Sequence, residues 1–340
     1  MYKNYKKQDG AADMAEENVV VKEFEFPSNS AYTTIHGKFW IPQGDIKCVL
    51  QISHGMSEYI DRYDEFARYL AARGILVVGN DHMGHGDSIN SKDEFGYFAP
   101  KEWGVPRKEK GERSSSYYTV KDLLEVTKLA KKEAPGVPYV LLGHSMGSFL
   151  ARRYMMEYGE EIDGAIIMGT GNQPKPLLNT AIGVSNFLRA ARGPRHRSKA
   201  FAYLMFGSYN KKIEDSNNPY DWVTSDEEKL EKYNSDERSG FLFTMNGIET
   251  LLATIKYIQK ERNIANIPKD IKMFFVSGEE DPVGEYGKQV EFVYNQYKEA
   301  GIKDISIKLY PGCRHEILNE VNRQEVYEDL YNWLLDNFIK

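Results

Sequence analysis

One stretch of this sequence is constrained to fold as a strand, a sharp turn and a helix. The apolar run 139–142 precedes the pentapeptide 143–147, Gly-His-Ser-Met-Gly, and apolar side chains at helical spacing follow it. So tight a passage from strand to helix leaves no room for Cβ atoms, which glycine lacks. A serine on such a turn has its hydroxyl exposed above the sheet. Ser145 is therefore the predicted nucleophile, and because the pentapeptide alone also occurs by chance, the prediction depends on its flanks.

A serine hydroxyl needs a base to take its proton and a carboxylate to orient that base. Where the nucleophile lies on this kind of turn, the acid and then the histidine follow it along the chain. Only His196 and His315 follow Ser145. His196 lies in a basic, polar stretch without a preceding strand, whereas His315 follows the alternating apolar run 305–309. Because catalytic groups favour loops held by a rigid scaffold, His315 is the predicted base.

The carboxylate is expected in the loop that follows the apolar run 273–276. Glu279, Glu280 and Asp281 all lie in this loop. Asp281 is preferred because Pro282 presets a turn, which helps to fix one carboxylate toward the strand ends. The two glutamates stay open as alternatives by proximity.

A tetrahedral intermediate needs two backbone N–H donors, one from the residue after the nucleophile and one from an earlier loop at a strand end. Met146 has the first position. The apolar run 48–53 leads directly into His54, Gly55 and Met56, so the Met56 amide is the second predicted donor. His54 itself is equally consistent with a core or loop histidine that has no chemical role.

Other motifs extend this pattern. They are His-Gly-Met-Ser-Glu-Tyr at 54–59, Arg-Tyr at 62–63, Asp-His-Met-Gly-His-Gly-Asp-Ser at 81–88, Gly-Glu-Glu-Asp-Pro-Val at 278–283 and Gly-Cys-Arg-His-Glu at 312–316. With these motifs the chain, from about Glu23 onward, resembles the monoacylglycerol lipase and lysophospholipase branch of the α/β-hydrolase superfamily, also described as a serine aminopeptidase family.

The resemblance implies a catalytic triad of Ser145, Asp281 and His315. It also implies an oxyanion hole formed by the amides of Met56 and Met146. The chain departs from many relatives at Ser148, where they have another glycine. We expect that difference to alter helix packing more than chemistry.

The order of elements predicts an α/β class, the α/β-hydrolase fold, with a mostly parallel central sheet covered by helices on both faces. Strands are predicted near 20–26, 33–41, 48–53, 75–79, 139–142, 165–168, 273–276 and 305–309, with helices near 62–72 and 120–132 and a long loop at 101–116. Residues 1–18 are predicted to be a disordered arm. The core is then formed by 19–170 and 268–340.

Strand alternation stops between Thr170 and Ile267. Helical or irregular segments replace it at 177–192, 201–206 and 241–260, which predicts a mainly helical cap, 171–267, inserted after the sixth strand. Ligands of open α/β sheets bind at the carboxyl ends of the strands. Apolar cap residues are therefore expected to line an acyl pocket or to form the core of the cap itself; they include Leu177, Leu178, Phe187 and Phe206.

Composition excludes several function classes. The net charge of −6 gives no basic footprint for nucleic acid. Two cysteines, Cys48 and Cys313, offer no disulfide framework. Residues 1–17 lack the apolar core of a secretory signal, and no segment is long and apolar enough to span a membrane. A cytoplasmic protein without stable membrane insertion, cofactor or protein partner is predicted.

Two further clusters have alternative interpretations. Asp81, His82, His85 and Asp87 carry metal-ligand side chains, but a metal needs three or four converging ligands, and the neighbouring glycines already explain a turn; no metal is predicted. A basic run is expected to be a solvated cap face or a site for a phosphate headgroup. It consists of Arg189, Arg192, Arg195, His196, Arg197 and Lys199.

The predicted function is that of a serine carboxylic-ester hydrolase. Its expected substrate is a lipid-like ester, a monoacylglycerol or a lysophospholipid, cleaved through an acyl-enzyme on Ser145. The alternatives are a serine peptidase or amidase of the same fold and a non-catalytic binding protein. The ordered set of nucleophile, acid and base argues against the last alternative, because a binder needs none of the three.

Overall fold

The computed structural model describes residues 19–98 and 115–339 and contains an eight-stranded sheet in the order β1-β2-β4-β3-β5-β6-β7-β8. The strands are β1 (Val20–Pro27), β2 (Thr34–Ile41), β3 (Cys48–Ser53), β4 (Ile75–Asn80), β5 (Tyr139–His144), β6 (Gly164–Met168), β7 (Lys272–Gly278) and β8 (Ile305–Tyr310). The pairs β1–β2 and β2–β4 are antiparallel, and every other neighbouring pair in this sheet, from β4 to β8 in sheet order, is parallel. The predicted α/β class with a mostly parallel sheet is confirmed. The predicted arm 1–18 lies outside the described residues.

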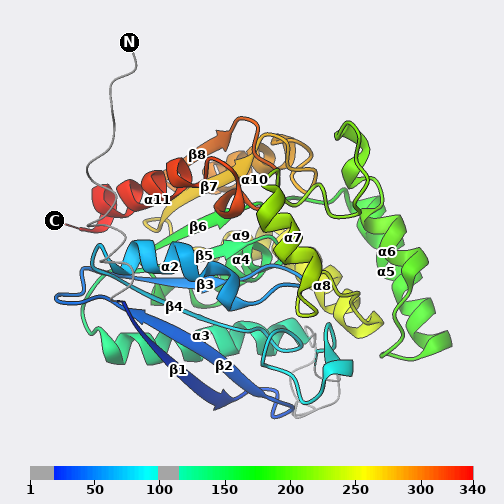
Figure 1. Ribbon diagram of the computed structural model, residues 1–340, viewed down its shortest axis with the longest axis horizontal. Coiled ribbons are helices and arrows are strands. Elements are labelled where there is room, and N and C mark those ends of the chain that lie inside the picture. Colours follow the sequence, from blue (N-terminus) through cyan, green and yellow to red (C-terminus); the bar gives the residue numbers. More distant parts are fainter. Residues whose placement is uncertain (1–18, 99–114, 340) are drawn as a thin grey trace.

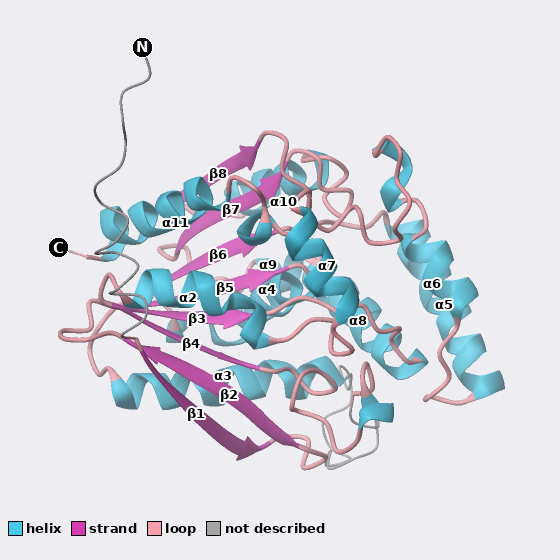
Figure 2. Cartoon of the chain, in the orientation of Figure 1, coloured by secondary structure: helices cyan, strands magenta, loops and turns pink. Residues whose placement is uncertain are grey.

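Helices cover both faces of this sheet (Figure 1, Figure 2). They are α2 (Asp64–Ala71), α3 (Ser115–Glu133), α4 (Met146–Tyr158), α5 (Lys175–Arg192), α6 (Lys199–Phe206), α7 (Glu227–Ser235), α8 (Met245–Ile258), α9 (Glu261–Ile264), α10 (Lys288–Glu299) and α11 (Arg323–Phe338). Strands β3, β5 and β6 are buried along their whole length, as is typical of parallel strands covered on both faces. Two separate apolar clusters result, one beneath α3, α4 and α10 and the other beneath α2 and α11.

One predicted boundary is corrected by tertiary contacts. Within the described residues helix α3 already includes Ser115, upstream of the predicted start near 120, and Tyr118 is buried in the core while the Arg153 guanidinium donates to Ser116 Oγ at 2.6 Å. The rest of the predicted loop, 101–114, lies outside the described residues. Helix α8 begins at Met245, within the segment 241–260 that was predicted to be helical or irregular, because the Thr244 side chain accepts a hydrogen bond from the Gly247 amide and so caps the helix.

The segment between β6 and β7 carries helices α5 to α9 and no strand. It lies beyond the carboxyl ends of the parallel strands (Figure 1), and α8 packs against both α4 and α5. Its buried side chains, among them Leu178, Phe201 and Leu252, belong to the same cluster as those of α3 and α4. The segment is therefore continuous in packing with the sheet.

The close approach of α4 to β3 gives a first prediction, for Gly147→Ala. A Cβ at this position would overlap the carbonyl oxygens of Ser53 and His54, which are backbone atoms that cannot move aside cheaply. We expect the variant to lose about 1–3 kcal/mol of unfolding free energy through overpacking. It should also react more slowly with a small fluorophosphonate, because the turn that carries Ser145 would shift.

Thermal unfolding and labelling rates test this expectation. The matched control is Gly183→Ala, a glycine within α5 where an added Cβ meets nothing within 4 Å. In a helix interior that change should be neutral or stabilise by up to about 1 kcal/mol. Equal melting temperatures for both variants would contradict the proposed steric role of Gly147.

Candidate active site

Ser145 lies on the turn between β5 and α4 in a backbone conformation that side chains rarely adopt. Its φ is 52° and its ψ is −119°. Such strain persists only where the surroundings enforce it, and it concentrates at functional sites. Here the Ser145 amide donates to the Met168 carbonyl at 3.0 Å, which ties the turn to the end of β6.

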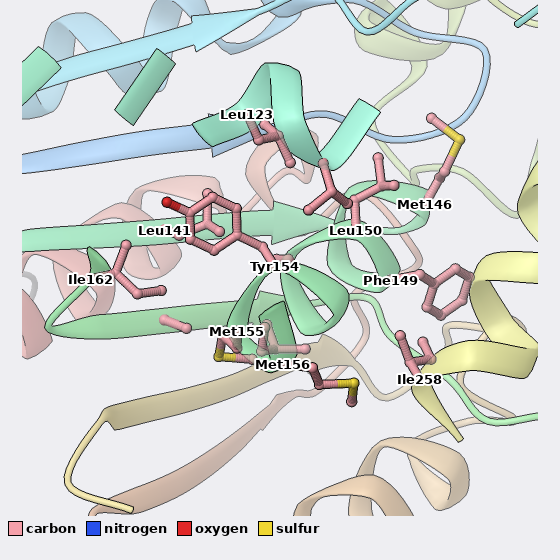
Figure 3. Packing of buried hydrophobic residues seen from close by; sticks show 14 of the residues in the cluster. Leu123, Leu141, Met146, Phe149, Leu150, Tyr154, Met155, Met156, Ile162 and Ile258 are labelled. Atoms are coloured by element: carbon pink, nitrogen blue, oxygen red, sulfur yellow. The ribbon is translucent and has the colours of Figure 1, made fainter. Parts of the chain in front are cut away.

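Helix α4 supports the turn of Ser145 through buried side chains that pack against the sheet and α3. Leu150 and Tyr154 extend from α4 toward Leu141 of β5 and Leu123 of α3 (Figure 3). Tyr154 also shares a hydrogen bond of 2.9 Å with Thr127. Because the helix is packed along its length, the position of Ser145 relative to the sheet is fixed.

Asp281 and His315 meet although they lie in different loops. The Asp281 carboxylate is fully buried, and its Oδ1 lies 2.9 Å from His315 Nδ1; this contact has hydrogen-bond length, although the ring is not ideally aligned. Oδ1 also accepts from the Val283 amide at 2.9 Å, and Oδ2 accepts from Ser277 Oγ at 3.0 Å. Burial alone would raise the pKa of Asp281, but the His315 imidazole and these donors lower it below its ordinary value. Glu279 and Glu280 are exposed in the same loop.

His315 lies beside the turn that carries Ser145. Its ring packs against the ring of His144, the residue before Ser145, at 4.8 Å between centroids, and against Trp222 at 5.1 Å. Between the described residues there is no hydrogen bond from Ser145 Oγ to His315. Catalytic hydrogen bonds are often long without substrate and tighten when substrate binds.

The loop that carries Met56 approaches the same turn. A Cβ on Gly55 would lie 2.5 Å from Glu58 Oε1 and 3.1 Å from Ser145 Cβ, so a larger residue would crowd this approach. Ser57, at a φ of 55°, reverses the chain, and its Oγ donates to the Phe241 carbonyl at 2.7 Å. In the part of the chain that the structure describes, neither the Met56 nor the Met146 amide donates to another protein group. The role of both amides as oxyanion donors stays a prediction.

The Asp81 side chain and the His82 backbone hold the segment around this loop through hydrogen bonds. Asp81 accepts from the amides of Ile60 and Asp87, both at 2.8 Å, and burial raises its pKa to about 7. His54 Nε2 accepts from the His82 amide at 2.9 Å, and burial lowers the pKa of His54 to about 4. His54 is thus a neutral structural residue. Among residues 19–98 and 115–339, no three His, Cys, Asp or Glu side chains converge as metal ligands.

Three arginines of the basic run are engaged within the chain. Arg189 pairs with Glu249 at 3.1 Å and Arg195 with Glu94 at 2.8 Å. Arg197 donates to backbone carbonyls in the loop 93–95. The contacts of Arg195 and Arg197 fasten the segment 193–198 to the loop 93–95.

Sequence reasoning assigned no role to a buried network next to the site. Glu58 and Arg62, quoted above only as motif residues, connect to His144 and to Glu316. The spacing of Glu58 and Arg62, four residues apart, was the available signal for their ion pair.

A serine on a strained turn after β5, an acid after β7 and a histidine after β8, all on a mostly parallel eight-stranded sheet, define the α/β-hydrolase fold. The family described as serine aminopeptidase, S33, matches residues 44–322, so the chain belongs to this family and is a serine hydrolase. The predicted family is confirmed.

Individual relatives agree with this assignment. The chain is 26% identical over 301 residues to a monoacylglycerol lipase of Mycolicibacterium smegmatis, covering 88% of this chain and 91% of the relative. A thermostable carboxyl esterase from Bacillus coagulans superposes with a TM-score of 0.83 at 25% identity, covering 94% and 99% of the two chains. A monoglyceride lipase variant from Saccharomyces cerevisiae shares the fold, with a TM-score of 0.72 at 20% identity over 94% and 96%.

Within the described ranges, none of the helices is both long enough and apolar enough to cross a membrane.

Proposed function

We propose that this protein hydrolyses a lipid-like carboxylic ester, a monoacylglycerol or a lysophospholipid, through an acyl-enzyme on Ser145. The observation that carries the proposal is the contact of 2.9 Å between the buried Asp281 and His315, whose ring lies against His144 beside Ser145. This arrangement supplies an acid, a base and a nucleophile in the order that the chemistry needs.

In the first half-reaction His315 takes the Ser145 proton as the oxygen attacks the ester carbonyl carbon. The carbonyl oxygen becomes an oxyanion, to which the Met56 and Met146 amides donate. The intermediate collapses, the C–O bond to the alcohol breaks, and His315 protonates the leaving alcohol. Throughout, the charge of Asp281 stabilises the imidazolium.

In the second half-reaction a water molecule replaces the alcohol. His315 removes a proton from the water, which attacks the acyl carbon on Ser145. The same two amides stabilise the second oxyanion. Collapse then releases the carboxylic acid and returns the proton to Ser145.

The lipid-like substrate class is supported by the names of the relatives and by the apolar side chains around the site. We propose that residues 171–267 act as a cap over Ser145. Leu177 and Phe187 are 59% and 70% exposed, so these two are poor candidates for the walls of an enclosed acyl pocket, and Leu178 is buried in the core. Ile182 and Leu188 are only partly buried and pack on the cluster that contains Met146.

We therefore expect Ile182→Ala and Leu188→Ala to change the preferred acyl-chain length. One methylene contact is worth about 1–3 kcal/mol, which limits the shift between neighbouring chain lengths to roughly 10- to 200-fold in kcat/KM. A series of monoacylglycerols of increasing chain length measures it.

The control for this series is Leu177→Ala, because that side chain is exposed on the same helix. Its chain-length profile should match the wild type. Unchanged profiles for Ile182→Ala and Leu188→Ala, with folding verified, would indicate that the core loops, and not the cap, determine the preferred acyl-chain length.

Two measurements test the proposed function itself. Fluorophosphonate labelling, located by peptide mapping, should modify Ser145. A panel of short esters, monoacylglycerols, lysophospholipids and aminoacyl amides should show turnover of esters well above that of amides, because amides need protonation of a poorer leaving group. Faster amide turnover would favour a peptidase, and absence of both labelling and turnover would favour a binding protein.

A further inference from the structure

A buried carboxylate outside the proposed triad receives donors from several segments that form the site. The Glu58 side chain is 3% exposed. Its Oε1 accepts from the Gly55 amide and from Tyr63 Oη at 2.9 Å, and lies 3.0 Å from His144 Nδ1. Its Oε2 accepts from Arg62 Nη1 at 2.9 Å. A carboxylate with this many donors is fixed in its charged form.

The surroundings of His144 determine its protonation. Its Nδ1 faces the Glu58 carboxylate, and its Nε2 lies 3.3 Å from the carbonyl oxygen of His315. Both partners are acceptors without a hydrogen to give, since Tyr63 Oη, also 3.0 Å from Nδ1, donates its hydrogen to Glu58. A hydrogen on each ring nitrogen satisfies both contacts, which favours the imidazolium form of His144.

The pKa of His144 agrees with this geometry. Burial would lower it, but the hydrogen bond and the charge of Glu58 raise it above its ordinary value, with a further contribution from Glu316. The charged groups around the ring are Glu58, Arg62 and Glu316, while Tyr63 and His54 are neutral. The other titratable group that faces the ring is His315, at 4.8 Å between ring centroids.

Arg62 extends the network to the other side of the site. Its two Nη atoms donate to both oxygens of Glu316, each at 2.6 Å, and Glu316 directly follows His315. Two buried carboxylates, Glu58 and Glu316, then face two cations, Arg62 and His144. The cluster is neutral only when His144 is charged, and an uncompensated buried charge would be strongly destabilising.

We infer that Glu58 and His144 form a buried carboxylate–imidazolium pair that acts as a positioning device for the three loops of the site. Glu58 holds the Met56 loop through the Gly55 amide and the Ser145 turn through His144. Through Arg62 and Glu316 it holds the loop of His315. The inference rests on the proposed function, because positioning has a purpose only if these loops catalyse.

The charge of His144 can be measured in the unmodified protein. In nitrogen-15 NMR of the histidine rings, we expect both ring nitrogens of His144 to carry hydrogen at pH 7. The resonance is assigned by its loss in His144→Gln. A neutral His144 ring at pH 7 would overturn the pair, whatever the activity of the enzyme.

Glu58→Gln tests the consequence for catalysis. The substitution preserves volume and an acceptor for the Gly55 amide but removes the charge. We expect kcat to fall up to about 100-fold through misplacement of the loops, with KM almost unchanged because ground-state binding is not touched.

The pH profile separates positioning from a purely structural role. The competent form has a protonated His144 whose pKa is raised, so wild-type activity should be present below that pKa and decline as pH rises through it. Without the Glu58 charge this pKa falls, and the alkaline decline in Glu58→Gln should begin at lower pH. An unshifted alkaline limb would overturn the inference.

The matched control is Glu157→Gln, a carboxylate only 14% exposed that pairs at 2.7 Å with a buried arginine, Arg153, near the end of α4. It should leave kcat and the pH profile unchanged.

If Glu58 and His144 act as one unit, the double variant Glu58→Gln/His144→Gln should lose no more activity than the less active of the two single variants. Wild-type kcat in Glu58→Gln, or strictly additive losses, would overturn the positioning role alone. Absence of labelling at Ser145 in the wild type would instead overturn the proposed function.

Discussion

Ser145→Ala is expected to lower kcat for ester hydrolysis by about 10³- to 10⁶-fold, the range over which nucleophile loss leaves only binding and oxyanion contributions. The change removes one oxygen from a turn and creates no large cavity. The unfolding temperature should therefore stay close to that of the wild type. Initial rates with a short ester and a thermal melt measure the two quantities.

A hydroxyl removed elsewhere provides the control. Ser306 lies on β8, and its Oγ makes only a long contact of 3.5 Å with the Met273 carbonyl. Ser306→Ala should retain full activity. Ester turnover near the wild-type rate in Ser145→Ala would exclude Ser145 as the nucleophile.

Asp281→Asn is expected to lower kcat by about 10⁴-fold, the effect that an amide has at this position of a serine triad. The carboxamide can present an N–H to His315 Nδ1, which favours the wrong tautomer and leaves the base unable to accept the Ser145 proton. It also cannot stabilise the imidazolium. Steady-state kinetics at neutral pH measure the loss.

The neighbouring carboxylates serve as controls for Asp281. Glu279 and Glu280 are exposed in the same loop, so Glu279→Gln and Glu280→Gln should change kcat very little. If either control lowered kcat strongly while Asp281→Asn lowered it only slightly, the acid would have been assigned to the wrong residue.

The sequence alone predicted the parts of this protein that depend on local patterns. The turn at Ser145 and the loops of Asp281 and His315 each follow a continuous or alternating apolar run, which predicts a strand. Parallel strands bring their carboxyl ends to one edge of the sheet. Residues separated by more than a hundred positions could therefore be placed together without knowledge of their contacts. The turn-forming Pro282 was enough to prefer Asp281 over its neighbours.

Tertiary structure alone decided what depends on contacts between distant side chains. Arg62 and Glu316 are 254 positions apart, and no periodicity in either segment indicates their pairing. Leu177 and Leu178 are adjacent and alike in sequence, yet the first is exposed and the second is buried.

The basic run 189–199 is another case in which the sequence did not indicate the partners of charged side chains. From the sequence, Arg195 and Arg197 could have bound an external anion. In the structure, Arg195 pairs with Glu94 and Arg197 donates to carbonyls of the loop 93–95. Hydrophobic periodicity reports which face of an element is covered. The partner that satisfies a buried charge is chosen only when the elements pack, because that choice depends on distances between segments that the chain order does not encode.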